Sequence, residues 1–194
     1  MINEPNEARG AIFIEPTWYK PLRKKLPEPL RSAFILAYHT GIRVNELMRI
    51  HWRDINVAKH LIHLPGDVTK TGRPRLVPLP RDFDRRPGQA DELVFPLGTY
   101  RKRWIKTCVA VGAGRWETAE DGKRHYAGLL LRHCRHTAIR NMSDAGLHEA
   151  RIMAVSGHVT RSMFDRYNIG REEDVAAARK AIEQFHRKAQ ERKK

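Results

Sequence analysis

The sequence predicts a mainly α-helical fold with one small three-stranded antiparallel β-sheet. Apolar residues recur at helical spacing in several separate stretches, strand-forming stretches are confined to residues 54–79, and glycines stand where the helices would end. With 194 residues, of which 41% are apolar, the chain can fill one ordinary core. Wholesale disorder and a small disulfide-stapled fold are therefore both disfavoured.

The amino-terminal residues 1–27 are expected to form an irregular segment or linker, because Pro5, Pro16 and Pro21 interrupt any periodic pattern. The first helix is predicted over residues 30–39, where apolar side chains fall on one helical face and Gly41 suits the position after the last turn. A second helix is predicted to begin near Val44.

Strands are predicted at residues 61–64, 68–69 and 75–79, with a hairpin tip at 70–74. A helix is predicted at about residues 99–111. The glycine-rich and charged stretch 112–128 is interpreted as a loop, with a short hairpin as the alternative.

The remaining chain is predicted to be helical over residues 132–145 and 148–155, followed by a short helix that Thr160 caps. A last amphipathic helix and basic tail are predicted over residues 174–194. Its apolar residues, Val175, Ala178, Ile182, Phe185 and Ala189, repeat at steps of 3 and 4. Because that seam is narrow, we expect this helix to lie on a groove, either of its own chain or of a neighbour.

The charge predicts a polyanionic partner. Lys and Arg number 37 against 22 Asp and Glu, a net charge of +15 at pH 7. Nucleic acid is the expected partner because binding to phosphates releases condensed counterions; the alternative is that the charge only keeps the chain soluble. The spacing of Cys108 and Cys134 resembles no metal site and suggests a reducing cytosol, and no apolar stretch approaches the length of a membrane span.

Four stretches, in order, resemble the signature of the tyrosine recombinases, the phage-integrase family of site-specific DNA recombinases. They are Thr40–Leu47, Thr69–Leu79, Arg132–Ala138 and Ser156–Tyr167. The resemblance extends over roughly residues 28–180, so the catalytic domain is assigned to 28–173. It implies the DNA breaking-rejoining fold and strand cleavage and rejoining through a 3′-phosphotyrosine intermediate, with no metal and no cofactor.

The resemblance also implies partners: double-stranded DNA, further recombinase protomers in a DNA-bound tetramer, and accessory DNA-bending proteins. It places the reaction in the bacterial cytoplasm, on the nucleoid, for a bacterial or phage protein. The family's amino-terminal core-binding domain is absent from these 194 residues. We therefore expect the chain to be a catalytic fragment of a longer protein, the alternative being a protein that works with a partner.

Six residues match the family's catalytic positions. Arg43 and Arg135 stand where the family has two phosphate-clamping arginines, whose planar, permanently charged guanidinium groups suit a pentavalent phosphate. Lys70 stands where the family's lysine protonates the leaving 5′ oxygen, with Arg73 and Arg75 as nearby alternatives. The remaining three are Arg132, His158 and the proposed nucleophile, Tyr167.

The third motif departs from the family's His-x-x-Arg pattern. With Arg135 as the clamp, the histidine position falls on Arg132; shifting by one residue would place His133 there, but His136 would then replace the arginine. Arg132 can donate to a phosphate oxygen but cannot accept a proton near neutral pH. A catalytically degenerate DNA-binding module therefore remains an alternative, as does a relaxase similar to type IB topoisomerases.

Two further features have simpler interpretations. Glu46 lies three residues after Arg43, so it is expected either to orient that guanidinium or to cap its own helix. The cluster of His133, Cys134 and His136 lacks the spacing of known zinc sites, so a metal site is disfavoured.

Overall fold

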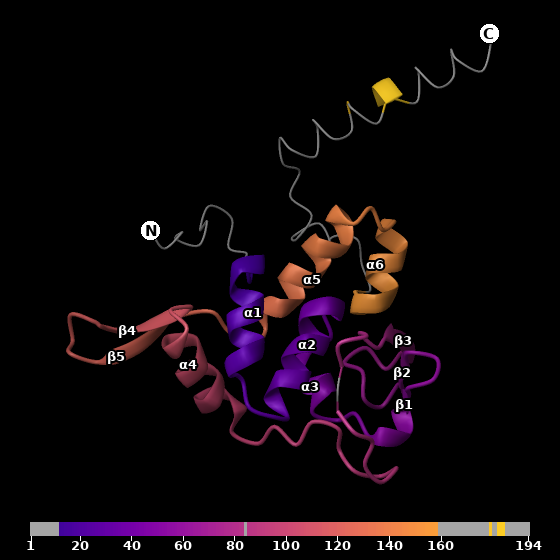
Figure 1. Ribbon diagram of the computed structural model, residues 1–194, viewed down its shortest axis with the longest axis horizontal. Coiled ribbons are helices and arrows are strands. Elements are labelled where there is room, and N and C mark those ends of the chain that lie inside the picture. The colour runs from indigo at the N-terminus through magenta and orange to yellow at the C-terminus, as the bar shows by residue number, and fades with distance from the viewer. Residues whose placement is uncertain (1–11, 84, 159–178, 180–181, 185–194) are drawn as a thin grey trace.

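A computed structural model describes residues 12–83, 85–158, 179 and 182–184 (Figure 1). Its helices are α1 (Pro16–Lys25), α2 (Leu30–Thr40), α3 (Val44–Leu47), α4 (Tyr100–Ala110), α5 (His133–Asp144) and α6 (Glu149–Ser156), with one 3₁₀ turn at Trp52–Asp54. Its strands are β1 (Ile55–Asn56), β2 (Leu61–Leu64), β3 (Arg75–Pro78), β4 (Gly114–Thr118) and β5 (Arg124–Gly128). No described helix has the length and apolar composition needed to span a bilayer.

Helix α2 forms the centre of the core and packs most extensively against α5 (Figure 1). It is buried on nearly all sides, with Leu30, Phe34 and Leu36 at 1% exposure or less. Gly41 ends the helix in the left-handed conformation, with a φ of 68°, as the glycine at this position in the sequence predicts. A Cβ at Gly41 would lie 3.3 Å from the Cβ of Ala138, so glycine here also permits the close approach of α2 to α5.

Residues 1–27 were predicted to be irregular. That prediction is wrong for the residues of this segment that the structure describes, because residues 16–25 form α1. Pro16 occupies its first position, where its missing N–H costs nothing, and Pro21 removes only one helical hydrogen bond. Packing compensates, since Leu22 is fully buried and Tyr19 lies 4.5 Å from Tyr38 between ring centroids. Leu22 belongs to the same apolar core as the buried residues of α2, so α1 packs as part of the domain that was predicted to begin at residue 28.

The predicted three-stranded antiparallel sheet is present, in the order β1-β2-β3, with Ile62 paired to Val77 at its buried centre. A predicted strand at residues 68–69 is wrong, because the third strand is β1. Thr69 instead lies in a turn, where its hydroxyl donates to the carbonyls of Gly66 and Arg73 at 3.0 and 2.9 Å. These local side-chain bonds replace the ladder bonds that a strand would need.

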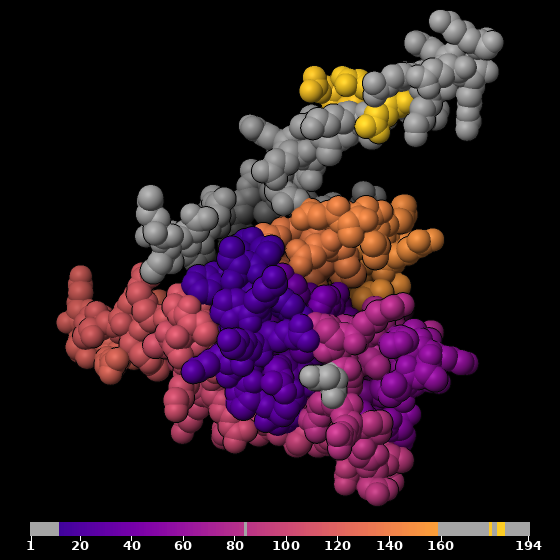
Figure 2. Space-filling model, viewed as in Figure 1, coloured from indigo at the N-terminus to yellow at the C-terminus, as the bar shows by residue number. Residues whose placement is uncertain are grey.

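Of the two interpretations of residues 112–128, the hairpin is correct. Strands β4 and β5 pair antiparallel and stand out from the body at the opposite end of the long axis from the three-stranded sheet (Figures 1 and 2). Tyr126 ties the hairpin to the core by donating its hydroxyl to the carbonyl of Leu129 at 2.9 Å. The predicted helix that Thr160 caps lies outside the described residues, as does most of the predicted helix from Asp174.

Candidate active site

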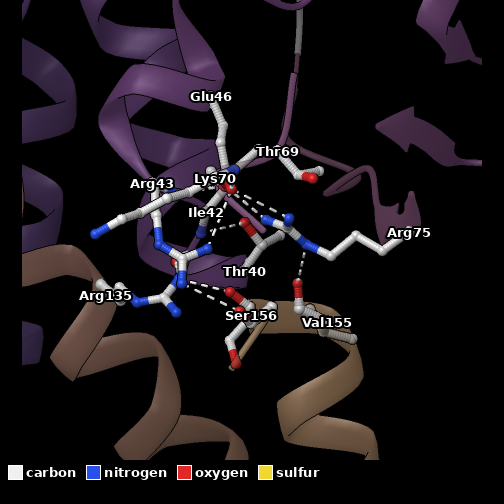
Figure 3. A network of polar contacts seen from close by, with 12 residues as sticks. Thr40, Ile42, Arg43, Glu46, Thr69, Lys70, Arg75, Arg135, Val155 and Ser156 are labelled. Atoms are coloured by element: carbon white, nitrogen blue, oxygen red, sulfur yellow. Dashed lines mark hydrogen bonds and ion pairs between the residues drawn. The ribbon is translucent and has the colours of Figure 1, made fainter. Parts of the chain in front are cut away.

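Two arginine side chains from distant parts of the chain meet at the carboxyl end of α6. The Nη2 of Arg43 donates to the carbonyl of Gly157 at 3.1 Å, and the Nη1 of Arg135 donates to the carbonyl of Ser156 at 2.5 Å (Figure 3). The last carbonyls of a helix lack helical partners and carry the negative end of its dipole, so they attract cations. Consecutive carbonyls therefore hold the two guanidinium groups side by side.

Glu46 is the centre of the network and is only 1% exposed. One carboxylate oxygen accepts the backbone N–H of Arg43 at 3.1 Å, and the other accepts Nη1 of the same arginine at 3.1 Å. Both expected roles of Glu46 are therefore found, since it caps α3 and orients Arg43. Burial raises the pKa of Glu46, but the hydrogen bonds and charges of Arg75 and Arg43 outweigh it and lower the pKa below 4.5.

Arg75 also belongs to this network, in a role that the motifs do not predict. Its Nη1 and Nη2 donate to the two carboxylate oxygens of Glu46 at 3.2 and 2.6 Å, and its Nε donates to the carbonyl of Val155 at 3.2 Å (Figure 3). The sequence indicates Arg75 only as an alternative to Lys70 as general acid. The available signal was strand alternation, which puts Arg75 on the same face of β3 as the buried Val77.

Gly157 allows α6 to end against the Arg75 side chain. Its φ is +73°, and a Cβ there would lie 2.8 Å from the Cζ of Arg75. The backbone conformation therefore favours glycine, and any larger residue would have to displace the Arg75 guanidinium from its contacts. Arg75 therefore packs directly against the residue whose carbonyl accepts from Arg43.

Lys70 lies in the turn between β2 and β3, with its side chain exposed. Its backbone N–H points at a carboxylate oxygen of Glu46, with 3.4 Å between the nitrogen and the oxygen. The carboxylate that orients Arg43 therefore also holds the turn that carries Lys70 (Figure 3). This places the lysine at the edge of the arginine pair.

His158 lies beside Arg135 and is 6% exposed. Nη2 of Arg135 is 3.0 Å from its Nε2, and Oγ of Ser156 is 2.9 Å from its Nδ1. Burial first, and then the positive charges of Arg135 and Arg43, lower the pKa of His158 to about 3. The imidazole is therefore neutral at physiological pH in the DNA-free protein.

The third motif is divided between the surface and the interior. Arg132 immediately precedes α5 and is exposed, and within the described residues it takes no part in the network around Glu46. His133 points inward, where its Nδ1 accepts the backbone N–H of Leu130 at 3.1 Å, and burial followed by the charge of Arg132 lowers its pKa to about 4. Of the two arginines of this motif, Arg135 is the one that contacts the carboxyl end of α6.

The structure thus brings together Arg43, Arg135, His158 and the turn of Lys70. It leaves Arg132 outside that network, and Tyr167 lies outside the described residues. No cluster of three or more His, Cys, Asp or Glu side chains suited to a metal ion occurs in the described part of the chain. The catalytic roles of the six residues remain predictions.

Comparison with known proteins identifies the family. The model of the phage integrase family matches residues 16–90. The shufflon-specific DNA recombinase of Escherichia coli is 30% identical over 135 residues, which cover 69% of this chain and 33% of the recombinase. The catalytic domain of bacteriophage HP1 integrase has the same fold, with a TM-score of 0.64 at 18% identity over 88% of this chain and 94% of that domain. The chain belongs to the phage integrase family.

A second integrase structure has a similar fold. The Tn1549 transposon integrase, solved in complex with transposon right end DNA, has a TM-score of 0.65 at 14% identity over 93% of this chain and 67% of its own. The predicted fold class, the catalytic domain of a tyrosine recombinase, is therefore confirmed. This integrase-family chain spans a third or less of the length of the curated relatives it matches.

Proposed function

We propose that this chain is the catalytic domain of a site-specific DNA recombinase that cleaves and rejoins DNA strands through a 3′-phosphotyrosine intermediate. The observation that carries the proposal is the pairing of Arg43 and Arg135 on the consecutive carbonyls of Ser156 and Gly157. Each guanidinium is a permanent cation with five N–H donors, so the pair suits the non-bridging oxygens of a DNA phosphate. A net charge of +15 supports salt-dependent attraction to double-stranded DNA.

In the proposed reaction, the hydroxyl oxygen of Tyr167 attacks the scissile phosphorus. The bond from phosphorus to the 5′ oxygen breaks, the tyrosine proton is lost to a base or water, and Lys70 protonates the departing oxygen. Arg43 and Arg135 stabilise the negative charge that builds up on the non-bridging oxygens. Attack by another strand's 5′ hydroxyl reverses these bond changes and rejoins the DNA, so the reaction consumes no cofactor.

A nicked suicide duplex carrying the cognate site, recovered from flanking genomic sequence, tests the proposal. The protein is incubated with this DNA, and a denaturing gel is searched for a covalent adduct. We expect an adduct with the parent protein and none with Tyr167→Phe. Tyr100→Phe serves as the control, because that tyrosine begins α4, away from the arginine pair, and it should form the adduct. An adduct that persists in Tyr167→Phe would contradict the assignment.

The exposed Arg132 favours one other function, a DNA-binding module that has lost cleavage, because this position lacks a proton acceptor. Arg132→His distinguishes the two. Tight DNA binding with no adduct in either the parent or the full-length protein, followed by an adduct in Arg132→His, would support the degenerate module. An adduct in the parent shows that arginine serves at this position. Relaxation of a supercoiled plasmid without recombinant product would instead indicate a topoisomerase-like relaxase.

We further propose that protomers assemble on DNA through the carboxyl-terminal segment from Asp174. The catalytic domain has an apolar groove of about 500 Å³ between α2, the end of β3, α5 and α6. Its lining residues are His39, Thr40, Pro78, Pro80, Arg81, Asp82, Met142, Leu147 and Val155. The narrow apolar seam of the segment from a neighbouring protomer suits this groove.

Removing the residues after Gly170 tests the assembly proposal, because this truncation retains Tyr167. We expect the truncated protein to bind DNA only as monomers and dimers in native gels, whereas the intact chain forms a tetramer. Leu147→Lys, which charges the groove, should have the same effect. Unchanged assembly after truncation would contradict the proposal.

A further inference from the structure

The segment 12–15, which leads into α1, lies against one face of α5 (Figure 1). The backbone N–H of Ile14 donates to Oγ1 of Thr137 at 2.7 Å, and both residues are 0% exposed. The Ile14 side chain belongs to the same apolar core as the buried residues of α2. Because the two partners are 123 residues apart in sequence, only the tertiary structure brings this segment to α5.

Arg140 holds the same segment from the next turn of α5. Its Nη1 and Nη2 donate to the two carboxylate oxygens of Glu15 at 2.8 and 3.1 Å, and its Cζ lies 4.3 Å from the ring centroid of Phe13. A planar guanidinium can make both contacts at once, with its edge on a carboxylate and its face on an aromatic ring. The Arg140 side chain is only 16% exposed, so these contacts replace most of its hydration.

Arg135 leaves α5 on the other side. Successive residues of an α-helix are rotated by about 100°, so Arg135 lies about 200° around the helix from Thr137 and about 140° from Arg140. Its Nη1 donates to the carbonyls of Gly41 and Ser156 at 2.7 and 2.5 Å. These carbonyls lie at the ends of α2 and α6, so Arg135 reaches both only while α5 keeps its rotation. The segment 12–15 restrains that rotation from the far side of the helix.

We propose that Arg140 is a positioning residue for Arg135. By holding the segment 12–15, it restrains α5 and keeps the Arg135 guanidinium on its two carbonyls. The inference rests on the proposed function in one respect only, because it is there that Arg135 binds the scissile phosphate. A small displacement of a group that contacts the reacting atoms is enough to slow a reaction, so loss of this restraint lowers the rate of cleavage.

The orientation of Arg135 can be measured on the DNA-free protein by NMR of the arginine side chains, with Arg135→Lys used to assign the signals. When hydrogen bonds hold a guanidinium, rotation about its Cζ–Nε bond is slow, and Nη1 and Nη2 give separate signals. We expect separate signals in the parent and averaged signals in Arg140→Glu and in Glu15→Arg. The double exchange of Glu15→Arg with Arg140→Glu restores the ion pair and should restore the separate signals.

Cleavage of the suicide duplex at saturating DNA provides the second readout. Arg140→Glu should form the adduct about tenfold more slowly, and the double exchange should recover most of the rate. Arg31→Glu is the matched control, because Arg31 pairs with Glu28 at 2.7 Å on α2 and the substitution changes the charge equally. It should leave the Arg135 signals and the rate unchanged. Arg140→Gln, which removes the ion pair without adding repulsion, should change both readouts in the same direction but less.

The outcomes separate a positioning role from a merely structural one. Thermal unfolding shows which variants are folded at the assay temperature. Folded Arg140→Glu or Arg140→Gln proteins with the parent signals and rate would refute the proposal, as would a loss that the double exchange does not reverse. A parent that forms no adduct but shows separate Arg135 signals, averaged in Arg140→Glu, would contradict the proposed function and leave the positioning role intact.

Discussion

Glu46 and Arg75 form a two-pronged ion pair, with nitrogen to oxygen distances of 3.2 and 2.6 Å, in which the glutamate and arginine side chains are 2% and 9% exposed. The pair joins α3 to β3, and the remaining Nε of Arg75 joins β3 to α6. Because the same carboxylate also contacts Arg43 and the backbone of Lys70, this one interaction organises three parts of the site.

Glu46→Gln should lower the free energy of unfolding by about 3 kcal/mol or more, because it leaves the buried charges of Arg75 and Arg43 without their counter-ion. Urea unfolding measures the change. Asp91→Asn is the control, since Asp91 pairs with Arg53 where both side chains are exposed, and it should leave the unfolding midpoint unchanged. Equal effects of the two substitutions would contradict the central role of Glu46.

The contribution of Glu46 should also depend on pH. Its pKa in the folded state is lowered below the ordinary 4.5, so protons bind more readily to the unfolded chain. The difference in unfolding free energy between the parent and Glu46→Gln should be complete above about pH 4.5. It should shrink as the pH falls through the lowered pKa, because a protonated Glu46 resembles glutamine. A difference that grows on acidification would show that the pKa is raised.

Gly157→Ala should destabilise the protein more than Gly146→Ala. Both glycines have positive φ, +73° and +76°, so both substitutions carry a backbone cost of about 1 kcal/mol. Only the Gly157 Cβ meets a neighbour, the Arg75 guanidinium, whereas nothing lies within 4 Å of a Cβ at Gly146. Thermal unfolding gives the difference between the two variants, and Gly157→Ala alone should slow adduct formation. Equal stability losses would indicate that Arg75 moves aside freely.

Lys70→Ala should slow cleavage of ordinary DNA by about 100-fold, the usual contribution of a general acid. On a substrate with sulfur in place of the scissile 5′ oxygen, Lys70→Ala should cleave almost as fast as the parent protein, because a thiolate leaves without protonation. Arg73→Ala is the control, since Arg73 is exposed on the same turn and should leave both rates unchanged. If sulfur restores the rate of Arg73→Ala instead, the acid is Arg73.

Much of this domain is encoded locally. Helical periodicity and Gly41 place the first predicted helix at residues 30–39, and the structure has it at Leu30–Thr40. The order of the motifs also identifies Arg43 and Arg135 from the sequence alone. Such features depend on residues a few positions apart, where caps and periodicity act.

Other features depend on contacts between distant segments. Pro21 argued against α1, yet packing of Leu22 into the core stabilises that helix. Arg43 reaches Gly157 across 114 residues, and Arg75 reaches Val155 across 80. The motifs therefore predicted which residues could bind a phosphate. Tertiary packing decided that the phosphate-binding arginines are held together by a buried glutamate, by Arg75 and by the end of α6. Only the folded chain creates the low-dielectric space in which those charges must pair.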